Sequence, residues 1–233
     1  MKLCVIPARG GSKRIPRKNI KEFNGKPIIA YSIEAAIKSG CFDKVIVSTD
    51  DAEIAEVAKK YGAEIPFMRS DELSNDHVGT LPVVKHAIEW FEHQSIVPDH
   101  VCCLYATAPF VQSQALKDAY AQLKDSEAEY CFTVTSYPFP IQRAIKLTTQ
   151  KRVEMFYPQY FNTRSQDLEE AYHDAGQFYW GKAEAFKIEK PIFSNDAVPF
   201  ILHRYLVQDI DTEEDWTQTE LMYQVLKQSG KIQ

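Results

Sequence analysis

Near its amino terminus the chain reads Pro7-Ala8-Arg9-Gly10-Gly11-Ser12-Lys13-Arg14-Ile15-Pro16-Arg17-Lys18-Asn19. An apolar run, Leu3 to Ile6, precedes this segment and predicts a buried first strand. Two glycines and a serine allow a tight turn that presents backbone N–H groups, and basic side chains surround that turn. Amides and fixed cations at the carboxyl end of a first strand are what a polyphosphate requires. The segment therefore predicts a phosphate-binding loop.

Two familiar phosphate-binding patterns do not match this loop. It is not G-x-G-x-x-G, and it is not a Walker A loop, because no Gly-Lys-Ser/Thr follows. A nicotinamide dinucleotide fold and a P-loop NTPase are therefore disfavoured. The simpler alternative is a solvated basic surface. Such a surface would need neither the glycines nor Pro7 and Pro16, which restrict the backbone on either side.

The following residues alternate between strand and helix patterns. Strands are predicted at 44–48, 64–68, 101–105 and 130–135, and helices at 27–39, 52–61, 81–91 and 112–124. Further strands are predicted at 176–180 and 198–202, with a short helix at 182–186 between them, and a capping box of Thr212 and Asp215 predicts a last helix. Such alternation predicts an α/β fold, a mostly parallel sheet with helices on both faces, as a single domain over 1–233.

Residues 137–162 have a different composition, with three prolines and many aromatic side chains. Two short strands, 141–147 and 153–156, are predicted around a hairpin turn at 148–151. An apolar excursion of this kind often lies on a partner subunit. We therefore expect a dimerisation arm at about 137–165, with a lid that folds on its own domain as the alternative.

Composition limits the classes of function. A formal charge of −5 disfavours a general nucleic-acid binder and makes the basic amino-terminal loop stand out. No apolar run reaches the length of a membrane span, and neither a signal peptide nor a membrane partner is expected. The five cysteines form no C-x-x-C pair and mostly lie in apolar runs, so we expect reduced cysteines in a cytoplasmic protein.

Polar residues follow several predicted strands, where open α/β sheets bind their ligands. Asp50, Thr107 and the pair Asp209 and Asp211 are in such positions. Two carboxylates two residues apart in an extended segment point to one side, and this arrangement suits Mg²⁺ bound with a triphosphate. The alternative is that Asp211 merely begins the helix that follows.

The segment from Ile6 to Lys13, with Pro16, Lys18 and Asn19, resembles the amino-terminal signature of the CMP-sialic acid synthetase family. These cytidylyltransferases join a nine-carbon acidic sugar to CMP. The resemblance covers nearly the whole chain. It implies a Rossmann-like fold of the nucleotide-diphospho-sugar transferase type, CTP and an acidic nine-carbon sugar as substrates, Mg²⁺ as cofactor, and a homodimer that exchanges the arm.

The resemblance also implies roles for individual residues. Arg9 and Lys13 would hold the β- and γ-phosphates, Lys18 would neutralise the α-phosphate, and Arg14 and Arg17 would be solvated or rim charges. Residues 69–76 resemble the family's Arg-Pro-x-x-Leu-Ala-x-Asp segment, although Arg69 could equally be a surface charge. The implied catalytic residues are Arg9, Lys13, Lys18, Asp209 and Asp211, the last two as metal ligands. The implied nucleotide-binding residues are Ala8, Arg9, Gly10, Gly11, Ser12, Lys13, Asn19, Arg69, Asp76 and Thr80.

The sugar-facing segments depart from the sialic acid pattern. The family's Leu-Gln-Pro-Thr-Ser-Pro-Leu-Arg is replaced here by residues 104–111, which puts Tyr105 and Val111 at sugar-facing positions. Tyr-Ala-Thr-Ala-Pro-Phe and His-Asp-Ala-Gly-Gln-Phe-Tyr-Trp resemble the pseudaminic acid branch, whose sugar replaces hydroxyls with an acetamido group and a terminal methyl. N-acetylneuraminic or legionaminic acid, or a non-catalytic nucleotide-binding protein, remain alternatives. The expected sugar-binding residues are Tyr105, Thr107, Arg164, His173, Gln177 and Tyr179.

Overall fold

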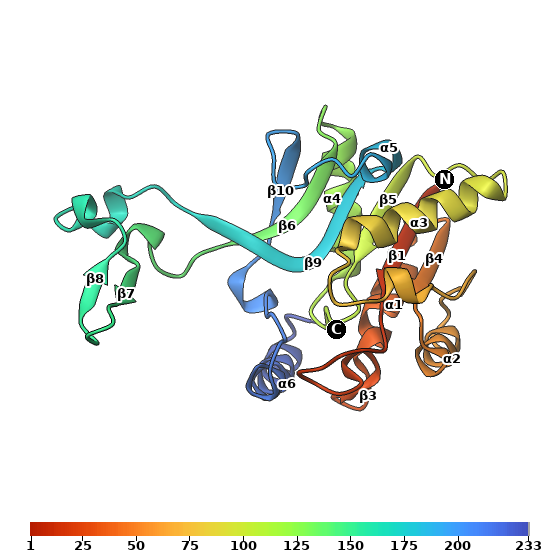
Figure 1. The fold of residues 1–233 in the computed structure, drawn as a ribbon, viewed down its shortest axis with the longest axis horizontal. Coiled ribbons are helices and arrows are strands. Elements are labelled where there is room, and N and C mark those ends of the chain that lie inside the picture. Colours follow the sequence, from red (N-terminus) through yellow and green to blue (C-terminus); the bar gives the residue numbers. More distant parts are fainter. Residues whose placement is uncertain (233) are drawn as a thin grey trace.

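A computed structural model describes residues 1–232 and is built on a six-stranded sheet (Figure 1). Its strands are β1 (Lys2–Pro7), β4 (Lys44–Ser48), β5 (His100–Leu104), β6 (Tyr130–Ser136), β9 (Tyr172–Lys182) and β10 (Ala197–Ile201). They lie in the order β10-β6-β9-β5-β1-β4. β1 is parallel to β4 and β5, and β6 is parallel to β10, whereas β9 is antiparallel to both of its neighbours. The prediction of a mostly parallel α/β sheet is confirmed.

Helices cover both faces of the sheet. On one face α1 (Ile28–Ser39), α2 (Ala52–Lys60) and α4 (Ser113–Lys124) bury Ile33, Ile54 and Leu116. On the other, α3 (Thr80–His93) and α5 (Ala183–Lys187) bury Phe91 and Phe186. The two apolar clusters leave the strands hydrophobic on both sides, as parallel sheets require.

The last helix, α6 (Glu213–Gln228), belongs to a third apolar cluster beside the sheet. Trp216 and Tyr223 pack edge-on against Phe23, which lies in β2 (Glu22–Phe23) and pairs with β3 (Lys26–Pro27). The predicted capping box is present, because Thr212 and Asp215 each bond the other's backbone N–H. The cap fixes where α6 begins, directly after the Asp209–Asp211 segment.

One predicted strand does not form. Residues 64–68 contribute only an isolated bridge between Glu64 and Ile46. Pro66 has no N–H to continue the ladder, and the Arg69 N–H instead bonds the Thr49 carbonyl at 2.8 Å. Residues 65–69 therefore leave the edge of the sheet, and Arg69 lies beside the carboxyl end of β4.

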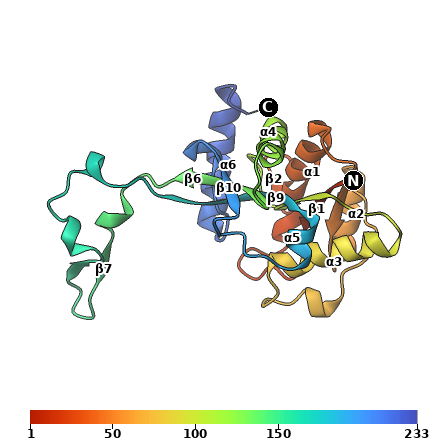
Figure 2. The same cartoon turned by 90° about the horizontal axis from the view of Figure 1, so that it is seen from above.

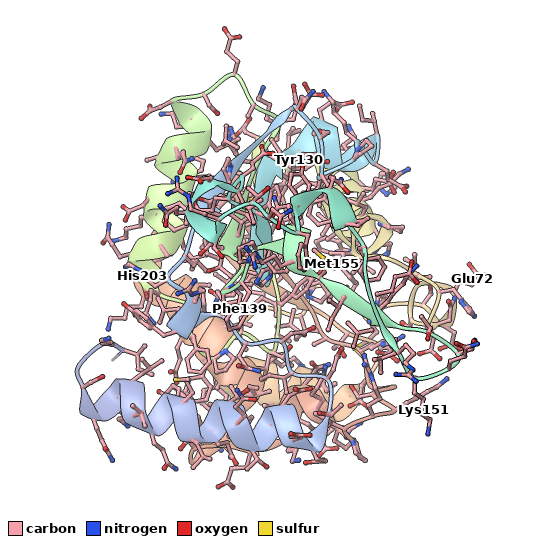
Figure 3. The ribbon with its side chains drawn as sticks, turned by 90° about the vertical axis from the view of Figure 1, so that its left-hand side faces the viewer. Glu72, Tyr130, Phe139, Lys151, Met155 and His203 are labelled. Atoms are coloured by element: carbon pink, nitrogen blue, oxygen red, sulfur yellow. The ribbon has the colours of Figure 1, made fainter. Side chains whose placement is uncertain are left out.

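Residues 137–171 form an arm that projects from the domain (Figures 1 and 2). It holds one hairpin, β7 (Ile145–Leu147) and β8 (Val153–Met155), together with 3₁₀ turns. Residues 141–143 form one of these turns, so the strand predicted over 141–147 is shorter than expected. Figure 3 looks at the molecule from the arm side and labels Phe139, Lys151 and Met155 on it.

The arm exposes large apolar side chains to solvent. Phe139 is 78% exposed and Leu147 73% exposed. The others are Tyr137, Ile141, Ile145, Val153, Phe156, Tyr157, Tyr160 and Phe161. Half of the large apolar side chains that residues 1–232 expose to solvent thus lie in this one projecting segment.

All five cysteines are buried and free. Burial raises the pKa of Cys4, Cys102, Cys103 and Cys131, which keeps these thiols protonated. Among residues 1–232, no helix has the length and apolar character needed to cross a membrane.

Candidate active site

The amino-terminal loop is fixed by bonds to its neighbours. The Ala8 N–H bonds the Ser48 carbonyl at 2.9 Å, and Asn19 Nδ2 donates to the Arg9 carbonyl at 2.9 Å. The Gly10 N–H donates to Asp50 Oδ1 at 3.0 Å. A Cβ on Gly10 would lie 2.7 Å from Asp51 Oδ2, so the glycine is required for this close approach.

A cleft of about 340 Å³ opens beside this loop at the carboxyl ends of β1 and β5. It brings together residues from distant parts of the chain, namely Arg9, Ser12, Lys13, Lys18, Asn19, Arg69, Asp76, Thr80, Tyr105 and Thr107. Most of the residues that the resemblance assigned to the nucleotide thus line one cavity. Ala8, Gly10 and Gly11 belong to the loop but do not line the cleft.

Two cations of the loop, Arg9 and Lys13, share the carboxylate of Asp76. Arg9 Nη1 lies 2.9 Å from Asp76 Oδ1, and Lys13 pairs with the other carboxylate oxygen. The contact with Lys13, followed by that with Arg9, lowers the pKa of Asp76. Arg9 also donates to the Asn75 carbonyl at 3.1 Å. An anion therefore already lies between the two side chains expected to hold phosphates.

Arg69 is buried at the floor of the cleft and is not a surface charge. Its side chain is 3% exposed and lies 3.7 Å from Asp50, while Nε donates to Ser74 Oγ at 3.1 Å. Burial lowers the pKa of Arg69. Asp50 thus links Arg69 to the Gly10 N–H and joins the amino-terminal loop to the segment from Arg69 to Asp76.

Lys18 lies beside the aspartate pair Asp209 and Asp211. Its Nζ donates to the Ile210 carbonyl at 2.6 Å and lies 3.7 Å from Asp211 Oδ1, and Arg14 pairs with the same oxygen at 2.7 Å. Burial, followed by the nearby charge of Asp211, raises the pKa of Asp209. The prediction that this pair ends a strand is wrong, because residues 207–211 are irregular and lie between a 3₁₀ turn at Arg204–Leu206 and α6.

Two further spaces adjoin the cleft. A pocket of about 330 Å³ is lined by Tyr105, Thr107, His173, Asp174 and Asp209 among others. A more apolar chamber of about 610 Å³ is lined by Tyr105, Asp174 and Tyr179 together with Leu81, Pro82, Ile192 and Phe193. Tyr105 lines the cleft, the pocket and the chamber, so it stands where the three meet.

Three residues expected at the sugar lie elsewhere in this chain. Gln177 is buried, and its amide donates to the Leu206 carbonyl. Val111 is also buried, in the cluster under α1 and α4, so its assignment as a sugar-facing residue is wrong. Arg164 lies in the arm, where it pairs with Asp167 at 2.7 Å.

Sequence reasoning also missed residues that shape the site. Arg17, predicted to be a solvated or rim charge, is 39% exposed and also pairs with both Asp51 and Glu53 at the start of α2. The acidic residues at that helix start were the available signal. Residues 174–180 are predicted to face the sugar, and Asp174 lines both the pocket and the chamber.

A fold of this kind, with its cationic cleft at the carboxyl ends of the strands, is typical of nucleotidyltransferases. Residues 3–229 match the family model described as Cytidylyltransferase, and the chain belongs to this family. Among solved structures it is similar to CMP:2-keto-3-deoxy-manno-octonic acid synthetase complexed with CTP. That match has a TM-score of 0.69 and 16% identity, and it covers 97% of this chain and 99% of the other, so it supports the fold alone.

Sequence relatives are more specific. The chain is 50% identical over 228 residues to a pseudaminic acid cytidylyltransferase of Campylobacter jejuni subsp. jejuni serotype O:2, covering 98% of both chains. It is 32% identical to a CMP-N,N'-diacetyllegionaminic acid synthase of Legionella pneumophila, covering 96% of both. It is 30% identical to an N-acylneuraminate cytidylyltransferase of Escherichia coli O18:K1:H7, covering 92% of this chain and 50% of that one.

Proposed function

We propose that this chain transfers CMP from CTP to pseudaminic acid and releases pyrophosphate. The anomeric hydroxyl of the sugar acid attacks the α-phosphorus, and the bond to the β-phosphate oxygen breaks. The observation that carries the proposal is the 50% identity, over almost the full length of both chains, to a protein named for this substrate. The cationic cleft beside the Gly-rich loop supports it.

The residues of the cleft act mainly by positioning and by charge. Arg9 and Lys13 would exchange Asp76 for the β- and γ-phosphates, which carry more negative charge than one carboxylate. Lys18, held by the Ile210 carbonyl, would place its ammonium group where charge develops at the α-phosphate. Holding the two substrates in line supplies a large part of such rate enhancements.

The aspartate pair fits a magnesium ion. Asp209 is partly buried beside Asp211, and this unfavourable proximity of two carboxylates would be relieved by a divalent cation. Within residues 1–232 no third acidic, His or Cys side chain joins them as a ligand cluster, so the remaining ligands would be phosphate oxygens and water. When bound, Mg²⁺ would neutralise phosphate charge.

We further propose that the protein works as a homodimer in which the arm lies on the partner. The exposed apolar side chains of the arm and its projection from the domain support this (Figure 2). Arg164 lies in that arm, so its expected contact with the sugar carboxylate would be made in the partner's site.

The function is tested by assaying pyrophosphate release from CTP with pseudaminic, N,N'-diacetyllegionaminic and N-acetylneuraminic acids. We expect turnover of pseudaminic acid and little or none of N-acetylneuraminic acid, because unpaired polar groups in a mismatched site cost several orders of magnitude in kcat/KM. Equal rates, or a preference for N-acetylneuraminic acid, would contradict the substrate assignment. No turnover of any of the sugars would contradict the reaction itself.

A further inference from the structure

An irregularity in β9 lies directly beside the sugar-side spaces. Opposite β6, Asp174 pairs with Val134 and Tyr179 pairs with Phe132. The two paired positions are two residues apart on β6 but five residues apart on β9, so β9 contains extra residues between Asp174 and Tyr179. Gly176 sits in the bulge with φ of 60°, a conformation that glycine adopts without strain. Bulges re-aim side chains and are frequent next to active sites.

The bulge is held in place by specific bonds. The Gly176 N–H donates to Asp174 Oδ1 at 3.0 Å, and Thr133 Oγ1 bonds both the carbonyl and the N–H of Phe178 at 3.3 Å. The Gln177 amide donates to the Leu206 carbonyl. These bonds explain why Gln177 is unavailable to the sugar, and they turn the Asp174 carboxylate toward the chamber and the pocket.

Asp174 is also bonded to Tyr179, one of the two tyrosines that line these spaces. The Tyr179 hydroxyl donates to Asp174 Oδ2 at 2.5 Å, and the Tyr105 hydroxyl lies 3.3 Å from Thr80 Oγ1. Burial, followed by the neighbouring Tyr105 and Asp174, raises the pKa of Tyr179, so its hydroxyl keeps the proton that it donates. An ionised carboxylate has about four lone-pair sites. Protein donors use two at Asp174, which is exposed to the spaces it lines.

We propose that Asp174 is a specificity-determining residue that accepts a hydrogen bond from a substrate amide N–H. This inference rests on the proposed function, since pseudaminic acid carries acylamido groups. An acceptor at the rim of an apolar chamber matches a donor that carries an apolar substituent. An amide N–H meets this condition through its acyl group, which can enter the chamber, whereas a hydroxyl carries nothing to fill it.

The test compares wild type with Asp174→Asn and Asp174→Ser. Both replacements keep an oxygen for the Gly176 N–H but remove the charged acceptor. Each protein is assayed with pseudaminic acid and with two analogues, in each of which one acetamido group is replaced by a hydroxyl. Asp118→Asn, on the exposed side of α4, is the matched control. Thermal unfolding of every variant is recorded in parallel.

With pseudaminic acid, we expect both Asp174 variants to lose about 10- to 100-fold in kcat/KM, the range for a hydrogen bond to a charged group. The KM for CTP should not change. For one of the two analogues the loss should fall to a few-fold, because the bond is already absent. A purely structural role would lower kcat/KM equally for all three sugars.

Equal losses on all sugars, or no loss, would overturn the inference while leaving the proposed function intact, provided that wild type turns over pseudaminic acid. A wild type inactive on pseudaminic acid but active on another sugar would contradict the substrate assignment and this inference together. The two failures are therefore distinguishable by the wild-type assay alone.

Discussion

At Gly10 the amino-terminal loop lies directly against Asp51, the residue that caps α2. A Cβ there would lie 2.7 Å from Asp51 Oδ2 and 3.1 Å from Asp51 Cβ, and Asp51 cannot move freely because Arg17 holds its carboxylate. The neighbouring Gly11 has nothing within 4 Å of the same position. A side chain is therefore excluded at Gly10 by the contact with Asp51, whereas Gly11 has space for one.

We predict that Gly10→Ala lowers the free energy of unfolding by about 1–3 kcal/mol, the usual cost of overpacking. Gly11→Ala, the matched control, should change it by less than about 1 kcal/mol. Urea unfolding of the two variants measures both values. Equal stability of the two proteins would show that the loop adjusts without cost.

Asp51 gives stability a defined pH dependence. Its bond from Arg17 is the main cause that lowers the pKa of Asp51 from 3.8 to about 2. Because the pKa is lower in the folded state, the stabilisation is fully present above pH of about 4 and is lost as the pH falls toward 2. Since Arg17 is 39% exposed, solvent screening reduces the effect to about 1 kcal/mol.

Asp51→Asn keeps an acceptor for the Ile54 N–H and removes the charge. We therefore predict that wild type exceeds this variant in stability at pH 6 and that the difference shrinks between pH 4 and pH 2. Chemical unfolding over this range measures it, and Arg17→Gln should remove the same pH-dependent part. A difference that stays constant with pH would contradict the assignment.

At the scale of elements, the segment between the Arg204–Leu206 turn and α6 carries the two candidate metal ligands. The capping box fixes the helix start through Asp215, leaving Asp209 and Asp211 ahead of it and facing Lys18. Of the three aspartates at 209, 211 and 215, the last caps α6. The first two lie near Lys18, which lines the cleft.

We predict that Asp209→Asn and Asp211→Asn each lower kcat at least about 100-fold, the scale for removing a stabiliser of transition-state charge. Chelation with EDTA should abolish turnover, and added Mg²⁺ should restore it. Asp215→Asn is the control, because it weakens the cap and hence stability but should leave kcat within a few-fold of wild type. Turnover that survives both substitutions and chelation would rule out the metal role.

Elements with a strong local pattern could be predicted from the sequence. Val84, Ile88 and Phe91 recur at helical spacing and bury one face of α3. The direction of β9 could not be read, because parallel and antiparallel strands share the same alternation of side chains. The β9 bulge, and with it the loss of Gln177 from the sugar, depends on bonds to Thr133 and Leu206 that are distant in sequence.

In the candidate site, too, residues within one short segment could be predicted, whereas those that depend on distant contacts could not. Arg9, Lys13, Lys18 and Asn19 lie in one short segment whose residue types match phosphate chemistry, and all four line the cleft. The family resemblance predicts that Val111, at the position of a family arginine, faces the sugar, but its side chain is buried in the core. Positions fixed by tertiary packing were therefore the ones that local patterns placed wrongly.

At the scale of the whole molecule, the arm determines the expected assembly. An isolated two-stranded hairpin is marginal in water, and this arm exposes many large apolar side chains besides. A second copy of the chain would cover them. The exposed apolar residues elsewhere on the domain are more scattered.

We predict a homodimer in solution that Phe139→Ser with Leu147→Ser weakens or dissociates, together with its activity. Light scattering over a dilution series measures the mass. Ile37→Ser, an exposed apolar position on α1, is the control and should leave the mass unchanged. A fully active wild-type monomer at assay concentration would contradict the proposal.

The position of β9 has a consequence for how the chain folds during its synthesis. β5 and β6 are never neighbours, because β9 lies between them and pairs with both. In a nascent chain that has reached residue 136, β5 therefore lacks its partner β9 and β6 lacks both of its partners, β9 and β10. Such unpaired edges are prone to pair wrongly. The sheet can close only after the whole arm has left the ribosome and residues 172–182 have followed it. Because β9 follows the arm in the sequence, β6 can be joined to the β4-β1-β5 part of the sheet only after the arm has been synthesised.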